Sequence, residues 1–224
     1  MSADSAKITT WMYLIRHGAT ANNISRPPVL QGNGINGPLV EIGLRQAEET
    51  AKFLTRTPLA AIYSSPLLRA MQTAEKIAAG RELTIQTSEL LKEVDVGRWE
   101  GKDWGWIEAN DPEAYRLHHT SAAEHGYPEG ENLKQVQARV VPELMRILDT
   151  HDRQHIAVVA HNVVIRSMIA YLLELPLDNV GHIHHDNCGI TLVRRRSGQT
   201  RLISTNSIFH LTSETPRTHT GESY

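Results

Sequence analysis

Several features that would point to other classes of protein are missing from this sequence of 224 residues. It has a single cysteine, Cys188, so it cannot form an internal disulfide. Its formal net charge is −2, which gives no general attraction to nucleic acid or to an anionic membrane surface. It has no internal repeat. What remains is the composition of an ordinary soluble enzyme.

Long apolar runs are also missing. No stretch approaches the ~20 apolar residues of a membrane span, and the first ten residues lack the apolar core of a secretion signal. A cytoplasmic location is therefore favoured. The length fits one domain with a substantial core, which we expect over residues 1–211, followed by a flexible polar tail at 212–224.

Apolar runs of strand character alternate with segments in which apolar residues recur at helical spacing. Strands are expected at 12–15, 61–64, 84–86, 156–160, 189–194 and 202–205, and helices at 44–54, 67–79, 133–150 and 163–173. Pro142 either kinks the third of these helices or begins a second one. The alternation predicts an α/β fold.

Three of the expected strands end in residues that can bind an anion. The strand at 12–15 runs into Arg16, His17 and Gly18. In open α/β sheets, ligands lie outside the carboxyl ends of the strands. Arginine suits phosphate or carboxylate, a neutral histidine can act as nucleophile, base or metal ligand, and glycine lets the backbone approach a ligand closely.

The other two strand ends strengthen this interpretation, because a single histidine after a strand is more often structural. Arg69 lies one turn into the helix that follows the strand at 61–64, and His161 directly follows the strand at 156–160. Parallel neighbouring strands would bring Arg69 and His161 together with Arg16 and His17. The sequence thus predicts a basic pocket for an oxyanion.

Several ordered motifs resemble the histidine phosphatase superfamily, in the branch that also holds the phosphoglycerate mutases. They are RHGATANN at 16–23, LQG at 30–32, GPL at 37–39, GLRQA at 43–47, SSPLLRAMQTA at 64–74 and LKEVDVGRWEG at 91–101. The match spans most of the chain. It implies a three-layer α/β/α sandwich with a mostly parallel central sheet.

The resemblance also implies roles for individual residues. His17 would be the nucleophile, forming a phosphohistidine that water hydrolyses, with its other ring nitrogen donating to a backbone carbonyl. Arg16, Arg69 and His161 would stabilise the transferring phosphoryl group. The expected substrate contacts are Arg16, Asn23, Gln31, Gly32, Arg69, His161 and Asn162.

By the same resemblance, Glu93 would be the general acid that protonates the leaving alkoxide. Asp95 is a competitor, because an extended segment would place both carboxylates on one face.

A histidine cluster at His182, His184 and His185 raises the question of a metal. Spacing alone does not show the fixed geometry that a metal site needs, so we expect no metal and place 182–186 near the pocket rim or at the surface. The inferred mechanism needs no cofactor.

Residues 102–132 form an expected lid insertion, where substrate choice should reside. Its aromatic residues either line an apolar leaving-group pocket or pack into a small core of the lid itself; they are Trp104, Trp106, Tyr115 and Tyr127. Phosphoglycerate mutases carry a basic cluster in this region, whereas only Lys102 and Arg116 are available here. The PEGEN run at 128–132 is more similar to the phosphatases.

Three positions depart from the usual pattern of the family. Ala19 replaces a common Glu, Asn36 a common Asp, and Asn162 a common Gly. None of these changes removes a catalytic group.

The sequence therefore predicts a metal-independent phosphomonoesterase that hydrolyses small phosphorylated metabolites. One alternative is a phosphotransferase of the phosphoglycerate mutase type, and another is a phosphate-binding protein that has lost turnover. The only partner expected is a small phosphomonoester, with no nucleic acid and no membrane. The identity of the substrate and the oligomeric state stay open, a homodimer included.

Overall fold

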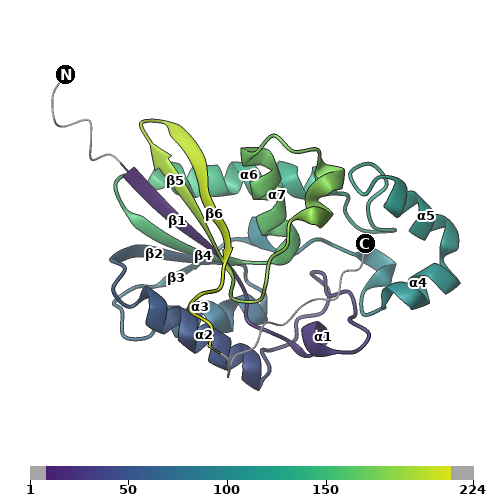
Figure 1. The fold of residues 1–224 in the computed structure, drawn as a ribbon, viewed down its shortest axis with the longest axis horizontal. Coiled ribbons are helices and arrows are strands. Elements are labelled where there is room, and N and C mark those ends of the chain that lie inside the picture. The colour runs from purple at the N-terminus through teal and green to yellow at the C-terminus, as the bar shows by residue number, and fades with distance from the viewer. Residues whose placement is uncertain (1–8, 213–224) are drawn as a thin grey trace.

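The computed structural model of the protein describes residues 9–212, so the tail predicted to be flexible lies almost wholly outside the described residues. A six-stranded sheet in the order β3-β2-β4-β1-β5-β6 organises the fold (Figure 1). The strands are β1 (Thr9–Arg16), β2 (Leu59–Ser64), β3 (Ile85–Thr87), β4 (His155–Ala160), β5 (Ile190–Arg196) and β6 (Gln199–Ser207). The first four are mutually parallel, while β5 runs antiparallel to β1 and β6 antiparallel to β5. The predicted mostly parallel sheet is confirmed.

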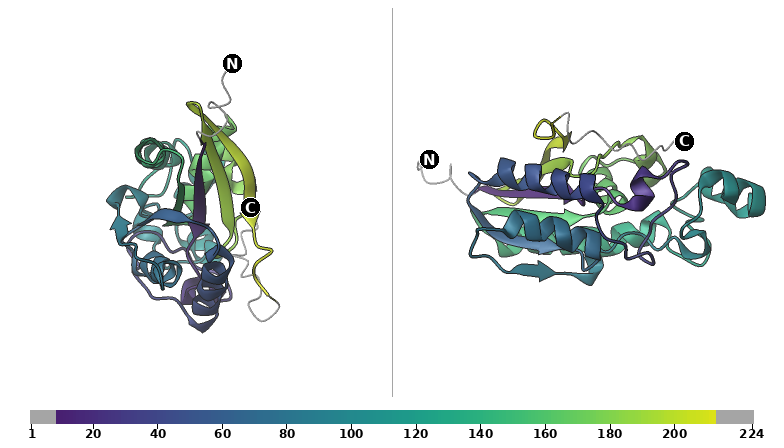
Figure 2. Two further views of the ribbon diagram at one scale, coloured as in Figure 1. Left: turned by 90° about the vertical axis from the view of Figure 1, so that its left-hand side faces the viewer. Right: turned by 90° about the horizontal axis from the view of Figure 1, so that it is seen from below.

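Helices cover both faces of this sheet (Figure 2). The helices are α1 (Ala21–Ile24), α2 (Glu41–Leu54), α3 (Leu68–Ala78), α4 (Trp104–Asn110), α5 (Pro112–Thr120), α6 (Leu133–Thr150) and α7 (Asn162–Leu172). Three short 3₁₀ segments are η2 (Glu89–Leu91), η3 (Gly97–Trp99) and η4 (Leu177–His182). Within residues 9–212, no helix is long and apolar enough to cross a membrane.

The alternation of side chains along the strands builds two cores. Met12 and Leu14 of β1 pack with α6 and α7, whereas Ile15 packs with α2 and α3. Because successive side chains of a strand point to opposite faces, one apolar strand supplies both cores. The predicted three-layer α/β/α arrangement is confirmed.

The structure adds local detail at two places, Pro142 in α6 and the turn at Cys188. Helix α6 runs unbroken through Pro142, so no second helix begins there, and Asn132 starts it with a capping box to Gln135. The strand expected at 189–194 corresponds to β5, which begins at Ile190, so Cys188 precedes it. Cys188 lies in a tight turn with a φ of 56° and is fully buried, where its N–H donates to the Arg16 carbonyl at 3.0 Å.

Candidate active site

The carboxyl ends of β1, β2 and β4 place the predicted cationic residues in one crevice. Arg16 is in register with Ala160, the last residue of β4, so His17 and His161 follow adjacent strand ends. Their ring centroids are 5.2 Å apart. Arg69, in the first turn of α3, donates from Nε to His17 Nε2 at 3.3 Å. The four residues thus form one buried cluster.

The hydrogen bonds of His17 fix its tautomer. Nδ1 lies 2.7 Å from the Gly18 carbonyl oxygen, which can only accept, so Nδ1 carries the proton. Nε2 faces the Arg69 N–H donor and therefore presents its lone pair. Burial, followed by the nearby Arg69 and Arg16 cations, lowers the pKa of His17 well below 6.5. His17 is a neutral imidazole whose unprotonated Nε2 can act as the nucleophile.

Gly18 has a different role from the predicted one. A side chain at this position would collide with the backbone of Gly43 in α2, so the close approach that requires glycine is between two protein segments and not toward a ligand.

Backbone carbonyls hold both arginines in place. Arg69 donates from Nη1 to the Ile35 oxygen and from Nη2 to the Gly32 oxygen, each at 2.9 Å. Arg16 donates from Nη1 to the His185 oxygen. Burial lowers the pKa of Arg69 to about 10, which leaves it cationic at neutral pH.

His161 is fully buried beside His17. Its Nε2 lies 2.7 Å from the Ser65 hydroxyl, and its Nδ1 has no hydrogen-bond partner among the residues described. Burial, followed by the Arg69, His17 and Arg16 charges, lowers its pKa well below 6.5. His161 is therefore neutral at neutral pH and keeps one ring nitrogen available to a ligand.

The predicted neutral contacts divide into two groups. Asn23, Gln31 and Asn162 line the pocket. Three donors, from the Thr20 amide, the Thr20 hydroxyl and Asn187, surround the Asn23 carbonyl oxygen, which leaves its NH₂ for the pocket. Gly32 does not line the pocket, because its N–H donates to Glu100 and its carbonyl holds Arg69.

The carboxylate that lines the pocket is Glu93, which is only 5% exposed. Its two oxygens accept from the amides of Val94 at 3.0 Å and Val163 at 3.3 Å. Burial raises its pKa above 4.5, and this effect outweighs the amide bonds and the two arginines. Asp95 does not line the pocket, since its side chain accepts from the Gly97 amide in a turn between 3₁₀ segments.

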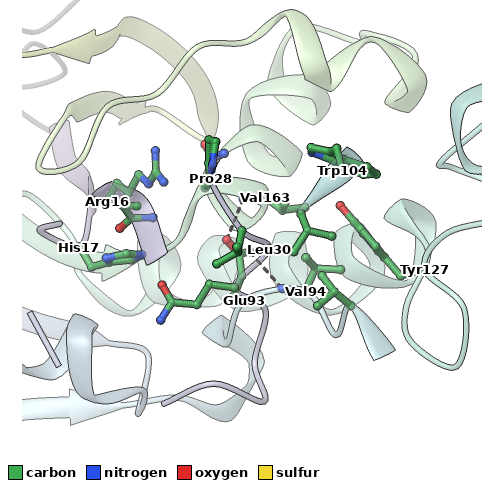
Figure 3. A pocket seen from close by; sticks show the side chains of 14 residues that line it. Arg16, His17, Pro28, Leu30, Glu93, Val94, Trp104, Tyr127 and Val163 are labelled. Atoms are coloured by element: carbon green, nitrogen blue, oxygen red, sulfur yellow. Dashed lines mark hydrogen bonds between the residues drawn. The ribbon is translucent and has the colours of Figure 1, made fainter. Parts of the chain in front are cut away.

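The pocket has a volume of about 80 Å³ and two unlike ends. Arg69 and His161 adjoin His17 but do not line the pocket. Arg16 and His17 lie at one end, Trp104 and Tyr127 at the other, with Glu93 and apolar side chains between them (Figure 3). The arrangement places a basic phosphate-sized site on one side of a carboxylic acid and an apolar surface on the other.

The lid aromatics serve both of the predicted purposes. Trp104 and Tyr127 line the pocket, and each also packs edge-on against Trp99 at centroid distances of 5.9 and 6.0 Å. Trp106 does neither and is 43% exposed.

The segment that supports the nucleophile was not predicted from the sequence. Asn187 is fully buried and donates from Nδ2 to the His17 carbonyl at 2.9 Å and to Asn23 Oδ1 at 3.1 Å. His185, expected at the rim or surface, is 1% exposed, and Arg16 bonds its carbonyl. Within residues 9–212, no group of three or more His, Cys, Asp or Glu side chains is arranged to hold a metal ion.

Comparisons with known proteins agree with this geometry. The chain is 28% identical over 200 residues to putative phosphoserine phosphatase 2 of Hydrogenobacter thermophilus, covering 89% of this chain and 96% of the relative. It is 31% identical over 185 residues to the probable phosphoglycerate mutase GpmB of Yersinia pestis, covering 81% and 83%. The solved structure of Bacillus stearothermophilus YhfR superposes with a TM-score of 0.81 at 33% identity, covering 90% of this chain and 98% of that one. The family model of the histidine phosphatase superfamily (branch 1) matches residues 12–208, and the chain belongs to this family.

Proposed function

We propose that this phosphatase hydrolyses phosphomonoesters of small metabolites through a phosphohistidine on His17, without a metal ion. The observation that carries the proposal is the neutral His17 tautomer, whose Nε2 lone pair lies beside the Arg69 cation while Gly18 holds Nδ1–H. Positioning and charge stabilisation supply most of the catalysis in phosphoryl transfer. Both are built into this cluster.

In the first step, the Nε2 lone pair of His17 attacks phosphorus and the P–O bond to the alcohol breaks. Arg16, Arg69 and the Asn23 amide hold the oxygens of the transferring group. Glu93, whose pKa is raised by burial, acts in its protonated form and gives its proton to the departing alkoxide. The products are a free alcohol, a Glu93 carboxylate and phosphohistidine.

In the second step, water attacks the phosphohistidine. The Glu93 carboxylate accepts a proton from that water, the P–N bond breaks, and inorganic phosphate leaves with Glu93 protonated again. His161 assists both steps through Nδ1, because a phosphoryl dianion beside it would raise its pKa and favour the imidazolium.

Phosphate release from a panel of phosphomonoesters tests this proposal. The panel contains 3-phosphoglycerate, phosphoserine, sugar phosphates and p-nitrophenyl phosphate, with and without EDTA. Release that is insensitive to EDTA is the expected result. Isomerisation of 3-phosphoglycerate that requires a bisphosphorylated primer, with no net phosphate release, would instead establish a mutase.

The pH dependence follows from the two shifted groups. His17 works deprotonated and its pKa is lowered, so the acidic limb of kcat/KM lies well below pH 6.5. Glu93 works protonated and its pKa is raised above 4.5, so kcat/KM for an alkyl phosphate falls as pH rises through that pKa. With p-nitrophenyl phosphate the alkaline limb should weaken, because nitrophenolate leaves without a proton. Identical alkaline limbs for both esters would contradict the role of Glu93.

Asn187 is expected to position the nucleophile. Asn187→Asp replaces the amide donor with a second acceptor facing the His17 carbonyl and Asn23 Oδ1. We expect kcat/KM to fall by about 10²-fold, the size typical of a small misplacement of reacting groups. Asn110→Asp, on the exposed end of α4, is the matched control and should keep wild-type activity. Equal activity of the two folded variants would disprove this role.

A further inference from the structure

A second, larger cavity adjoins the aromatic end of the catalytic pocket. Its volume is about 310 Å³, against about 80 Å³ for the pocket that holds His17. Four side chains line both spaces, namely Leu30, Trp104, Tyr127 and Val163. In Figure 3, Trp104 and Tyr127 lie at the end away from His17, and Leu30 and Val163 lie in the middle of the pocket near Glu93. A ligand whose phosphate lies at His17 therefore extends toward the second cavity past these side chains.

The walls of the second cavity are largely apolar. Beyond the four shared side chains, Ala122, Leu133 and Val180 line it, together with polar side chains that include His118, His119, Arg166 and His182. Its main acidic residue is already engaged, because Asp178 accepts from the Ser121 hydroxyl at 3.0 Å and the Ala123 amide at 2.9 Å. Its size falls in the lower part of the range of small-molecule sites, about 300–1,000 Å³.

The path between the phosphate end and this cavity has no cation for a second acidic group. Among the described residues that line the catalytic pocket, Arg16 is the only arginine or lysine, and it belongs to the phosphate end. Lys102 lies over the Trp106 ring at 4.6 Å, Arg116 is exposed, and neither lines either space. Arg166 lines the second cavity but not the catalytic pocket, so it does not lie beside the phosphate end. The carboxylate of phosphoserine or phosphoglycerate would lie beside Leu30, Val94 and Val163, where desolvation disfavours it.

We propose that the second cavity holds the alcohol part of the substrate, and that this alcohol is uncharged near its phosphate and carries an apolar, ring-sized group. The ring packs against Trp104 and Tyr127, whose faces suit planar apolar partners. This inference rests on the proposed function, because it assumes that phosphate occupies the His17 end. It names a substrate class larger and less acidic than phosphoserine.

The test compares 3-phenylpropyl phosphate with n-propyl phosphate, because both release an unactivated primary alkoxide and differ only in the ring. We expect kcat/KM to be at least about tenfold higher for the phenylpropyl ester, as one added apolar group in a fitting pocket typically gives. Phosphoserine should be turned over no better than n-propyl phosphate. Equal rates for the two alkyl esters, or a clear preference for phosphoserine, would overturn the inference.

A pair of variants tests whether the second cavity is the cause of the preference for the phenylpropyl ester. Ala122→Phe fills the second cavity from the lid and should reduce the phenylpropyl-to-propyl ratio to near one. Ala109→Phe makes the same change on the exposed face of α4 and should keep the ratio. If Ala122→Phe does not fold, Thr120→Trp at the exposed end of α5 blocks the same cavity and should have the same effect.

The two proposals fail in different ways. No release of phosphate from any ester would contradict the phosphatase function itself. Release from both esters at equal rates would leave that function intact and reject only the second cavity as the alcohol site. A ratio that is high but unchanged in Ala122→Phe and Thr120→Trp would also reject it.

Discussion

His17→Ala lowers kcat/KM for every phosphomonoester by about 10⁴-fold or more, because the substitution removes the atom that attacks phosphorus. We expect no other residue to replace it, since no backbone carbonyl orients the ring of the neighbouring His161 as Gly18 orients that of His17. Initial rates of phosphate release, measured at saturating and subsaturating substrate, check the size of the loss.

The control for this variant is phosphate binding. Arg16, Arg69 and Asn23 are held by other bonds than those to the His17 ring, so His17→Ala should still bind inorganic phosphate in a calorimetric titration. A folded variant that binds phosphate and retains more than about one hundredth of wild-type kcat/KM would contradict the role of His17 as nucleophile.

Glu93→Gln lowers kcat/KM for n-propyl phosphate by about 10²–10⁴-fold, the contribution typical of a positioned general acid. The loss for p-nitrophenyl phosphate should be much smaller, because its leaving group departs as a stable anion. The comparison uses kcat/KM, which reports the first irreversible step and so excludes the later hydrolysis of phosphohistidine. The difference between the two losses, more than either loss alone, measures proton donation.

Glu129→Gln is the matched control, since Glu129 has the same side chain at a site where it is 70% exposed and paired with Arg98. It should leave both substrates at wild-type rates. Equal losses for the two esters in Glu93→Gln would mean that Glu93 supports the structure of the pocket and does not act as an acid.

The part of the site that could be predicted from the sequence is the part that follows strand ends. Arg16, His17 and His161 each come directly after, or at the end of, an apolar run, and parallel strands bring such positions together at one edge. Arg69 could be predicted in a similar way, although it lies in a helix and not at a strand end, because α3 begins just after β2.

The support beneath the nucleophile could not be predicted in this way. The bond from Asn187 to the His17 carbonyl joins residues 170 positions apart, and the segment that carries it has neither helical nor strand periodicity. A buried asparagine in a turn has no pattern that distinguishes it from a surface one.

The structure of the lid could likewise be predicted only in part from the sequence. Helices α4 and α5 are short, and they start from local devices, the Asp103 side chain that accepts from the Trp106 amide and Pro112 at the first turn. Their aromatic residues pack against one another and also line the pocket, so composition alone could not separate the two predicted roles. The second cavity forms where this lid lies against α7 and η4. No local sequence pattern predicts that contact.

The most direct test of the proposed mechanism is to trap the covalent intermediate. The enzyme is mixed with p-nitrophenyl phosphate, quenched in alkali within the first turnovers, digested, and analysed by mass spectrometry, with His17→Ala treated in parallel. We predict an acid-labile, alkali-stable phosphoryl group on the peptide that contains His17, present in the wild type and missing from the variant. Rapid phosphate release with no label on His17 at any time, and with inversion of configuration at a chiral phosphorus, would show direct attack by water and contradict the phosphohistidine mechanism.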